Sequence, residues 1–270
     1  MKPKIKFEDV KPETEKTILE NIVKKENIYK SNANFIPIDD LPSKYYFYPE
    51  GTKIYAKPMK VNDVKLLASL NQHNFDIVIN QVLSRNVTGI DIDNILRSDK
   101  FYLIFWLRAN TYKDAGYEVD FHCQHCEKDS KYNFDVDVLD VKYAKEGIDL
   151  VKEMPKSKDK IKTRFKSVLD ETKMLEFKKL NSGSIDSFDD DFLDLAMDIE
   201  MVNDSVLTLF QKYEYIKNME PIDYSFLISF VNSVGFGVEN VINATCNSCK
   251  GVTPQGVNFR SDFFIPKFEF

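Results

Sequence analysis

Hydrophobic positions recur at helical spacing over much of the chain, and this pattern predicts most of its helices. One stretch carries apolar residues at i, i+3, i+4, i+7 and i+8, which indicates an amphipathic helix with one buried face. These residues are Phe75, Val78, Ile79, Val82 and Leu83. We expect Gly89 to end this helix and Asp91 or Asp93 to cap a further one, which ends in FYLIFWLR at 101–108. Because that last segment is apolar all round, it should lie in the middle of the fold.

Residues 139–237 repeat the helical spacing in three further stretches, so this part of the chain is predicted to be mostly helical. Asp170 is expected to cap the first of these helices, and Gly235 to end the third. The residues expected to face inward are Met174, Phe177 and Leu180; Phe192, Leu195, Ala196 and Ile199; and Phe226, Leu227, Phe230, Val231 and Val234. The segment 182–184 (SGS) is interpreted as a linker.

Residues 41–59 have a different pattern, which is rich in tyrosine and interrupted by proline and glycine. The interruptions are Pro42, Pro49, Gly51 and Pro58. They predict short strands, with residues 49–51 as a turn between two of them. Asn62 is then expected to cap a helix whose apolar residues are Leu66, Leu67 and Leu70.

Two stretches alternate apolar and polar residues around a CxxC pair, and both predict the order strand, knuckle, strand. In the first, the apolar positions are Tyr117, Val119 and Phe121 before the cysteines, and Tyr132, Phe134, Val136 and Val138 after them. In the second, residues 241–244 lead in, and a turn at residues 250–251 leads towards Val257 and Phe259. This is the one internal repeat that we find in the chain.

The cysteines occur only in these two pairs, Cys123 with Cys126 and Cys246 with Cys249. A two-residue gap across a tight turn brings two thiolates about 3.5–4 Å apart, which is the edge of a tetrahedron with Zn–S bonds of about 2.3 Å. We therefore predict that the two hairpins share one structural Zn²⁺. With four sulfurs bound, the ion keeps no open position for water or substrate, which opposes catalysis.

Three other interpretations of the cysteines remain open: two dithiol redox centres, an iron–sulfur cluster, or cysteines without metal. A redox CxxC sits where a strand enters a helix, and neither pair is placed so. His122 and His125 flank the first pair and could replace a cysteine as ligand, but with four sulfurs available we expect them around the site or in solvent.

These patterns predict an α+β fold, in which a discontinuous zinc-ribbon-like β core carries a helical N-terminal region and a helical insertion. The expected parts are an N-terminal arm at 1–40, strands plus helices at 41–115, ribbon-like halves at 116–138 and 238–264, the insertion at 139–237, and an aromatic C-terminal tail at 265–270. Pro12 can open a helix in the arm, with a narrow stripe of Ile18, Ile22 and Val23 that suits a neighbour or a loose surface helix. At the other end, Phe263 and Phe264 are expected inside, and Phe268 and Phe270 in a partner.

Composition narrows the function classes. The net charge of −6, from 43 acids and 37 bases, opposes a general nucleic-acid binder. The longest apolar run, 101–107, is much shorter than the roughly 20 residues that span a bilayer, so no membrane insertion is expected. The opening MKPKIKFEDVKPETEK shows no apolar signal region, so we expect a protein made and kept in a cytoplasm, or released only by lysis. In that reducing setting the four cysteines are not expected to form structural disulfides.

No catalytic set can be assembled from the three histidines, of which His73 stands apart on a polar helix face. One acidic cluster is interpreted as a solvated helix start, since acids are favoured there and the loop glycine of a calcium motif is missing. Its members are Asp186, Asp189, Asp190, Asp191 and Asp194. We therefore predict that the protein is not an enzyme.

The order of four stretches, from Leu41 to Pro266, resembles the T-even-type (T4-like) bacteriophage baseplate hub protein family. The stretches are LPSKYYFYPEGTKIYAKPMKVNDVKLLA; DKFYLIFWLRANTY running into YEVDFHCQHC; EMPKSKDKIKTRFKSVLDETKMLEF; and YSFLISFVNSVGFGVENVINATCNSC followed by SDFFIP. The chain departs from the family in lacking its usual glycine at 45–46. In the knuckles, Gln124 and Asn247 stand where the family favours proline, and Glu127 and Lys250 where it favours glycine.

The resemblance implies a structural component of the central hub of a contractile tail baseplate, assembled in the host cytoplasm and carried in the virion. Its implied partners are other hub, tail-tube or tape-measure proteins, with a homo-oligomer as a further possibility. Two rivals stay open within the non-enzymatic class: an assembly factor that is absent from the mature virion, and a zinc-ribbon nucleic-acid-binding protein. Lys128, Lys131 and Lys250 on the knuckles favour the latter, but Glu127 and Asp129 offset them. A zinc enzyme ranks third, because the cysteines fill the valences of the metal.

Overall fold

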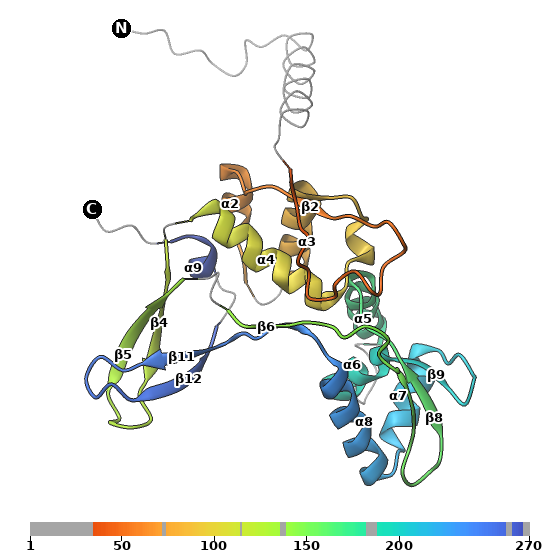
Figure 1. Cartoon of the computed structure of the whole chain (residues 1–270). Helices are drawn as coiled ribbons and strands as arrows, with labels where there is room; N and C mark the ends of the chain where they lie inside the picture. The colour runs from red at the N-terminus through yellow and green to blue at the C-terminus, as the bar shows by residue number, and fades with distance from the viewer. Residues whose placement is uncertain are drawn as a thin grey trace, which may run out of the picture. The chain divides into compact units, whose positions relative to one another are not determined.

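The computed structural model describes residues 35–71, 74–113, 115–135, 139–181, 188–257 and 261–266. The chain divides into two units, Met1–Ile36 and Pro37–Phe270, and the elements from β2 onward belong to the second. Helices and several small antiparallel sheets make up this unit, which confirms the α+β prediction (Figure 1). Within the described ranges, no helix has both the length and the apolar character needed to cross a membrane.

The elements in chain order are β1 (Ile36–Pro37), β2 (Tyr55–Ala56), α2 (Val61–Leu67), α3 (Phe75–Asn86), β3 (Val87–Thr88), the 3-10 helix η2 (Ile92–Asn94), α4 (Arg97–Thr111), β4 (Tyr117–His122), β5 (Asp129–Phe134), β6 (Val141–Lys142), β7 (Val151–Glu153), β8 (Lys160–Thr163), α5 (Val168–Asn181), α6 (Asp190–Asp198), β9 (Ile199–Val202), α7 (Leu209–Lys217), α8 (Pro221–Val234), β10 (Gly237–Val238), β11 (Val241–Thr245), β12 (Val252–Gly256) and α9 (Ser261–Phe264). Some expectations fall outside the described residues: the arm helix, the 182–184 linker, His73, Val136, Val138, Asp186, Phe259, Phe268 and Phe270.

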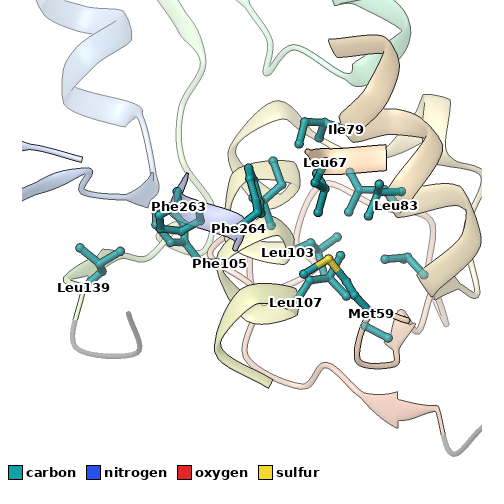
Figure 2. Close-up of a cluster of buried hydrophobic side chains, with 14 of the residues drawn as sticks. Met59, Leu67, Ile79, Leu83, Leu103, Phe105, Leu107, Leu139, Phe263 and Phe264 are labelled. Carbon is teal, nitrogen blue, oxygen red and sulfur yellow. The ribbon is translucent and has the colours of Figure 1, made fainter. Parts of the chain in front are cut away.

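The main core forms where α2, α3 and α4 meet, as the helical spacing predicts. Val78, Ile79, Val82 and Leu83 of α3 are buried, and so is most of the apolar face of α4. Figure 2 shows side chains of these helices turned towards one another, with Phe263 and Phe264 of α9 joining them. The labelled residues are Met59, Leu67, Ile79, Leu83, Leu103, Phe105, Leu107, Leu139, Phe263 and Phe264. Phe263 and Phe264 are therefore internal, which confirms that prediction.

The helix starts differ from the predicted ones by a few residues. Helix α2 begins after Lys60 rather than at Asn62, because the Asp63 carboxylate accepts the Lys60 amide at 3.0 Å. Asp91 caps the short η2, not α4. Asp170 lies inside α5, where its carboxylate accepts the Ser167 amide at 2.9 Å. The predictions of helices α2 and α5 are therefore right. In each, however, the acid at the third helical position accepts the backbone amide of the residue before the helix.

The strand predicted before the turn at 49–51 is wrong. Residues 42–47 form consecutive turns, and Lys44 and Tyr45 have left-handed φ angles of 51° and 63°. The buried Asp99 carboxylate accepts the Ser43 amide at 3.0 Å, so a side chain takes the place of a strand partner. The turn itself is confirmed by the Thr52 amide, which donates to the Pro49 carbonyl at 3.1 Å. After it, β2 pairs with β3.

Residues 139–237, the predicted insertion, begin and end at paired strands, since β6 and β10 are antiparallel neighbours. Beyond them lies a second core, which consists of Met154, Ile161, Leu195, Ala196, Ile199, Val202, Ile216 and Leu227. Helices α5, α6 and α8 are present as expected, with Gly235 ending α8. Leu180 is 86% exposed and Phe226 is 39% exposed, so the predicted inward positions of both side chains are wrong. The antiparallel sheet β7-β8-β9 was not predicted.

A buried carboxylate fixes α8 to the loop between β7 and β8. The Asp223 carboxylate accepts hydrogen bonds from the backbone amides of Lys156 at 2.7 Å and Ser157 at 2.9 Å, and Asp223 is fully buried. Burial raises the pKa of Asp223, but the two amide donors outweigh it and hold the pKa below the ordinary 3.8.

Charged side chains join α3 and α4 to the insertion. The ammonium of Lys100, which is fully buried, lies 2.8 Å from the carboxylate of Asp76 on α3 and 2.7 Å from that of Glu171 on α5. Arg97 bridges Glu171 at 3.2 Å and Asp194 on α6 at 2.9 Å. The insertion is therefore tied to the N-terminal helices by ion pairs as well as by the strands at its base.

Candidate metal centre

Two β-hairpins position the four cysteines, as the alternating pattern predicts. Strand β4 pairs with β5 from Tyr117↔Phe134 to His122↔Asp129, and β11 pairs with β12 from Val241↔Gly256 to Thr245↔Val252. Along β4, the apolar residues are buried and the polar residues between them are exposed, as expected for a strand with one buried face. The second strand of the second hairpin begins at Val252, earlier than expected.

The cysteines lie in two tight turns, which we call the first knuckle (residues 123–128) and the second knuckle (residues 246–251). In the first, the Cys123 amide donates to the Lys128 carbonyl at 3.0 Å, and the Glu127 amide to the Cys123 carbonyl at 2.9 Å. The second repeats both bonds, from Cys246 to the Gly251 carbonyl at 2.9 Å and from Lys250 to the Cys246 carbonyl at 3.0 Å.

The residue after the second cysteine of each knuckle has a left-handed backbone. The φ angles are 56° at Glu127 and 62° at Lys250. A side chain is strained in this region, whereas glycine is not. The structure therefore explains why glycine would suit these two positions better than the residues present.

The knuckles bring the four sulfur atoms together, all within 4.8 Å of one another. Across the hairpins, the Sγ atoms of Cys123 and Cys249 are 3.6 Å apart, and those of Cys126 and Cys246 are 3.8 Å apart. These separations match the edge of about 3.8 Å of a tetrahedron with Zn–S bonds of about 2.3 Å. They are much longer than the roughly 2.05 Å of a disulfide bond. The donor set fits a closed four-sulfur site.

Backbone amides aimed at the sulfurs favour the thiolate forms that a metal requires. The amides of His125, Ser248 and Gly251 lie 3.4 Å from the Sγ atoms of Cys123, Cys246 and Cys249 respectively. The amide of Cys249, with that of Ser248, lowers the pKa of the Cys246 thiol to about 6 against the effect of burial.

Cys126 behaves differently from Cys246. The Lys128 amide lowers its pKa, but the neighbouring sulfurs and burial raise the pKa of Cys126 to about 12. Full ionisation of the four thiols together therefore needs a nearby positive charge, because like charges at this distance disfavour one another.

The other polar groups near the cysteines have partners of their own. The His122 ring lies 3.0 Å from the Asp129 carboxylate, and the His125 ring 2.9 Å from the Val252 carbonyl, and both residues are exposed. Among the described residues, the four cysteines are the one group of three or more His, Cys, Asp or Glu side chains that meets in this way. Within the acidic cluster, Asp189 caps α6 by accepting two of its amides, as the helix-start interpretation predicts.

Two hydroxyl residues at the centre were not singled out from the sequence. Ser130 of β5 accepts the Asn247 amide at 3.0 Å, and Thr253 of β12 accepts the Gln124 amide at 3.4 Å. Each bond crosses from one hairpin to the other. The signal that could have found them is their equal spacing, since each follows the first cysteine of its own hairpin by seven positions.

The fold and the site together define an α+β protein in which two β-hairpins bring four cysteines together. Residues 36–251 match the family model described as T4 bacteriophage base plate protein. The match covers well over half of the chain, so the chain belongs to the T4 bacteriophage base plate protein family. No curated protein and no solved structure matches it.

Proposed function

We propose that this protein is a structural, non-enzymatic component of the central hub of a phage tail baseplate, and that one zinc ion stabilises its scaffold. The observation that carries the proposal is the four-sulfur cluster in a chain of the baseplate family. Cys123, Cys126, Cys246 and Cys249 would hold the ion. When bound, zinc supplies a cross-link between the hairpins, with no open position for a reaction.

The position of the insertion explains what such a cross-link would achieve. The chain passes from the first hairpin into the insertion and returns from it into the second, so pinning the hairpins together also fixes the paired strands at the base of the insertion. We propose that residues 116–138 and 238–264 act as one ribbon unit, which presents the insertion 139–237 to neighbouring subunits. The arm 1–40 and the tail 265–270 would serve as further attachments.

The outer face of α8 supports binding to protein neighbours. Its exposed positions include Ile222 and Phe226, while its charged residue Asp223 is fully buried. In a chain in which 30% of residues are charged, a helix face without charge resembles the core of a protein interface. Hub, tail-tube or tape-measure proteins, and other copies of this chain, are the proposed partners, met in the host cytoplasm and kept in the virion.

Nucleic-acid binding is less well supported by the lysines of the two hairpins. Lys131 lies 2.6 Å from the carboxylate of Glu118 and 3.7 Å from that of Asp120, so acids of its own hairpin partly neutralise it. A phosphate backbone would have to compete with these carboxylates as well as with the net charge of −6.

Purified tails of the encoding phage test the proposal. We expect mass spectrometry to find the chain in intact tails, and elemental analysis of the isolated full chain to find one zinc ion per chain. Phage carrying Cys246→Ser should assemble few complete tails, whereas Ser248→Ala, in the same knuckle, should assemble normally. Tails that lack the chain would indicate a departing assembly factor, and chains without zinc would refute the metal part.

A further inference from the structure

The two hairpins of the metal centre repeat each other residue by residue, and the repeat extends beyond the cysteines. Ser130 and Thr253 occupy equivalent positions on β5 and β12. Gln124 and Asn247, whose amides they accept, each directly follow the first cysteine of a knuckle. The contacts are therefore reciprocal: each hairpin offers one hydroxyl and one amide, and each receives the same from the other.

The hydroxyl residues of both contacts are buried, whereas Gln124 and Asn247 are exposed. Ser130 is 9% exposed and Thr253 is 2% exposed. Because β4-β5 and β11-β12 are separate two-stranded sheets, no shared ladder sets the distance between the hairpins. Side chains must set it, and the small apolar cluster of Phe121 and Ala244 with the cysteines is not directional. Hydrogen bonds are directional, so the hydroxyl pair can help to fix the register. Two exposed side-chain bonds also cross between the hairpins, from the His125 ring to the Val252 carbonyl at 2.9 Å and from the Asn247 side-chain amide to the Lys131 carbonyl at 3.0 Å, but the hydroxyl pair is the buried part of this set.

Thr253 also reaches the sulfur itself. Its hydroxyl oxygen lies 4.0 Å from the Cys123 Sγ atom, within reach of a weak hydrogen bond to sulfur. The same oxygen accepts the Gln124 amide, which leaves the hydroxyl proton free to point at the sulfur. Thr253 thereby joins the turn of one hairpin, a ligand atom and the strand of the other.

We infer that Ser130 and Thr253 are positioning residues of the metal centre, and that their crossed hydrogen bonds hold the two sulfur pairs at the spacing of a tetrahedral ion. This inference rests on the proposed metal site. Groups that orient metal ligands in this way typically change metal affinity by about 10- to 100-fold when they are removed. Serine at position 130 and threonine at position 253 both carry a hydroxyl. This group is small enough to fit between the hairpins and can accept a hydrogen bond from a backbone amide.

The test uses the full chain loaded with Co²⁺ or Zn²⁺. Thr253→Val keeps the shape of the side chain and removes its hydroxyl, and Ser130→Ala does the same for the other hairpin. Thr253→Ser is the conservative variant that restores the hydroxyl, and Ser248→Ala removes an exposed hydroxyl from the second knuckle as a control. The readouts are the absorption bands of tetrahedral Co²⁺, the affinity for Zn²⁺ in competition with a chromogenic chelator, and circular dichroism to verify folding.

We expect Thr253→Val and Ser130→Ala each to lower zinc affinity by about 10-fold or more and to alter the cobalt bands. Thr253→Ser and Ser248→Ala should behave like the unmodified protein. Unchanged affinity and bands in both hydroxyl-free variants would overturn the positioning role and leave the metal site standing. A loss in Thr253→Val that serine does not restore would also overturn it, because packing would then be the cause. If the unmodified chain bound neither ion, the metal site and this inference would both be refuted.

Discussion

Lys100 is the buried cation between α4 and the insertion, and replacing it with methionine tests whether ion pairs hold these parts together. Its ammonium lies 2.8 Å from the Asp76 carboxylate and 2.7 Å from that of Glu171, and the lysine is fully buried. The Glu171 side chain is only 10% exposed, whereas that of Asp76 is 37% exposed and keeps much of its hydration. In Lys100→Met, the carboxylate left buried without its cation is therefore mainly that of Glu171.

The expected size of the effect follows from this burial. Removing one partner of a buried ion pair costs about 3–5 kcal/mol, because it leaves the other charge poorly compensated. Arg97 still lies 3.2 Å from Glu171, so we expect the lower end of that range, about 3 kcal/mol. Domains are typically stable by about 5–15 kcal/mol, so this loss would be large and easily measured.

The assay is urea unfolding of the full chain in excess zinc, followed by circular dichroism. Lys65→Met, which changes an exposed lysine on α2, is the matched control and should shift the free energy of unfolding by no more than about 0.5 kcal/mol. The double variant Lys100→Met with Glu171→Leu should recover part of the loss, because it removes both buried charges. A single variant within about 1 kcal/mol of the unmodified chain, or a double variant no better than the single one, would refute the reasoning.

Three further predictions follow from backbone strain, a buried carboxylate and the aromatic core. Glu127→Gly and Lys250→Gly should each stabilise the chain by about 0.5–1 kcal/mol in urea unfolding, because a left-handed backbone strains any residue with a Cβ atom; an equal gain with alanine would contradict this. The carboxylate of Asp223, with its pKa held below 3.8, contributes stability above that pH and loses it as the pH falls further. Asp223→Asn should therefore lower the Tm at pH 7, and the difference should narrow below about pH 4; a constant difference would count against it. Phe263→Ala should cost about 3–5 kcal/mol in the same unfolding assay, and a cost below about 1 kcal/mol would show that α9 is not part of the main core.

Sequence patterns predicted those features that depend on neighbours close along the chain. The spacing of Val78, Ile79, Val82 and Leu83 defines one face of a helix by itself, and α3 buries that face. A CxxC turn likewise needs only its own residues to bring two sulfurs together. Pairing the two turns was a longer step, and the four sulfurs do meet, because two matching hairpins offered a single closed arrangement. The metal ion that they would hold stays a prediction.

The features that were missed depend on contacts between distant segments. Strands β7, β8 and β9 have three or four residues each, and lysine and glutamate occupy many of their positions, so their alternation was too short to stand out. Residues 42–47 turn because Asp99, far along the chain, accepts the Ser43 amide. Ser130 and Thr253 looked like ordinary strand residues, because the amides they accept belong to the opposite hairpin.

The paired strands at the base of the insertion have a consequence for how this chain can change. The Glu239 amide donates to the Asp140 carbonyl at 2.8 Å, so residues near the start and the end of the segment between the hairpins lie next to each other. Loop length between two such anchored points has only a weak effect on closure entropy. Relatives can therefore lengthen, shorten or exchange the segment between these residues while the span between the two cysteine hairpins stays the same. A virus that must fit new neighbours could vary this segment and leave the sulfur cluster untouched.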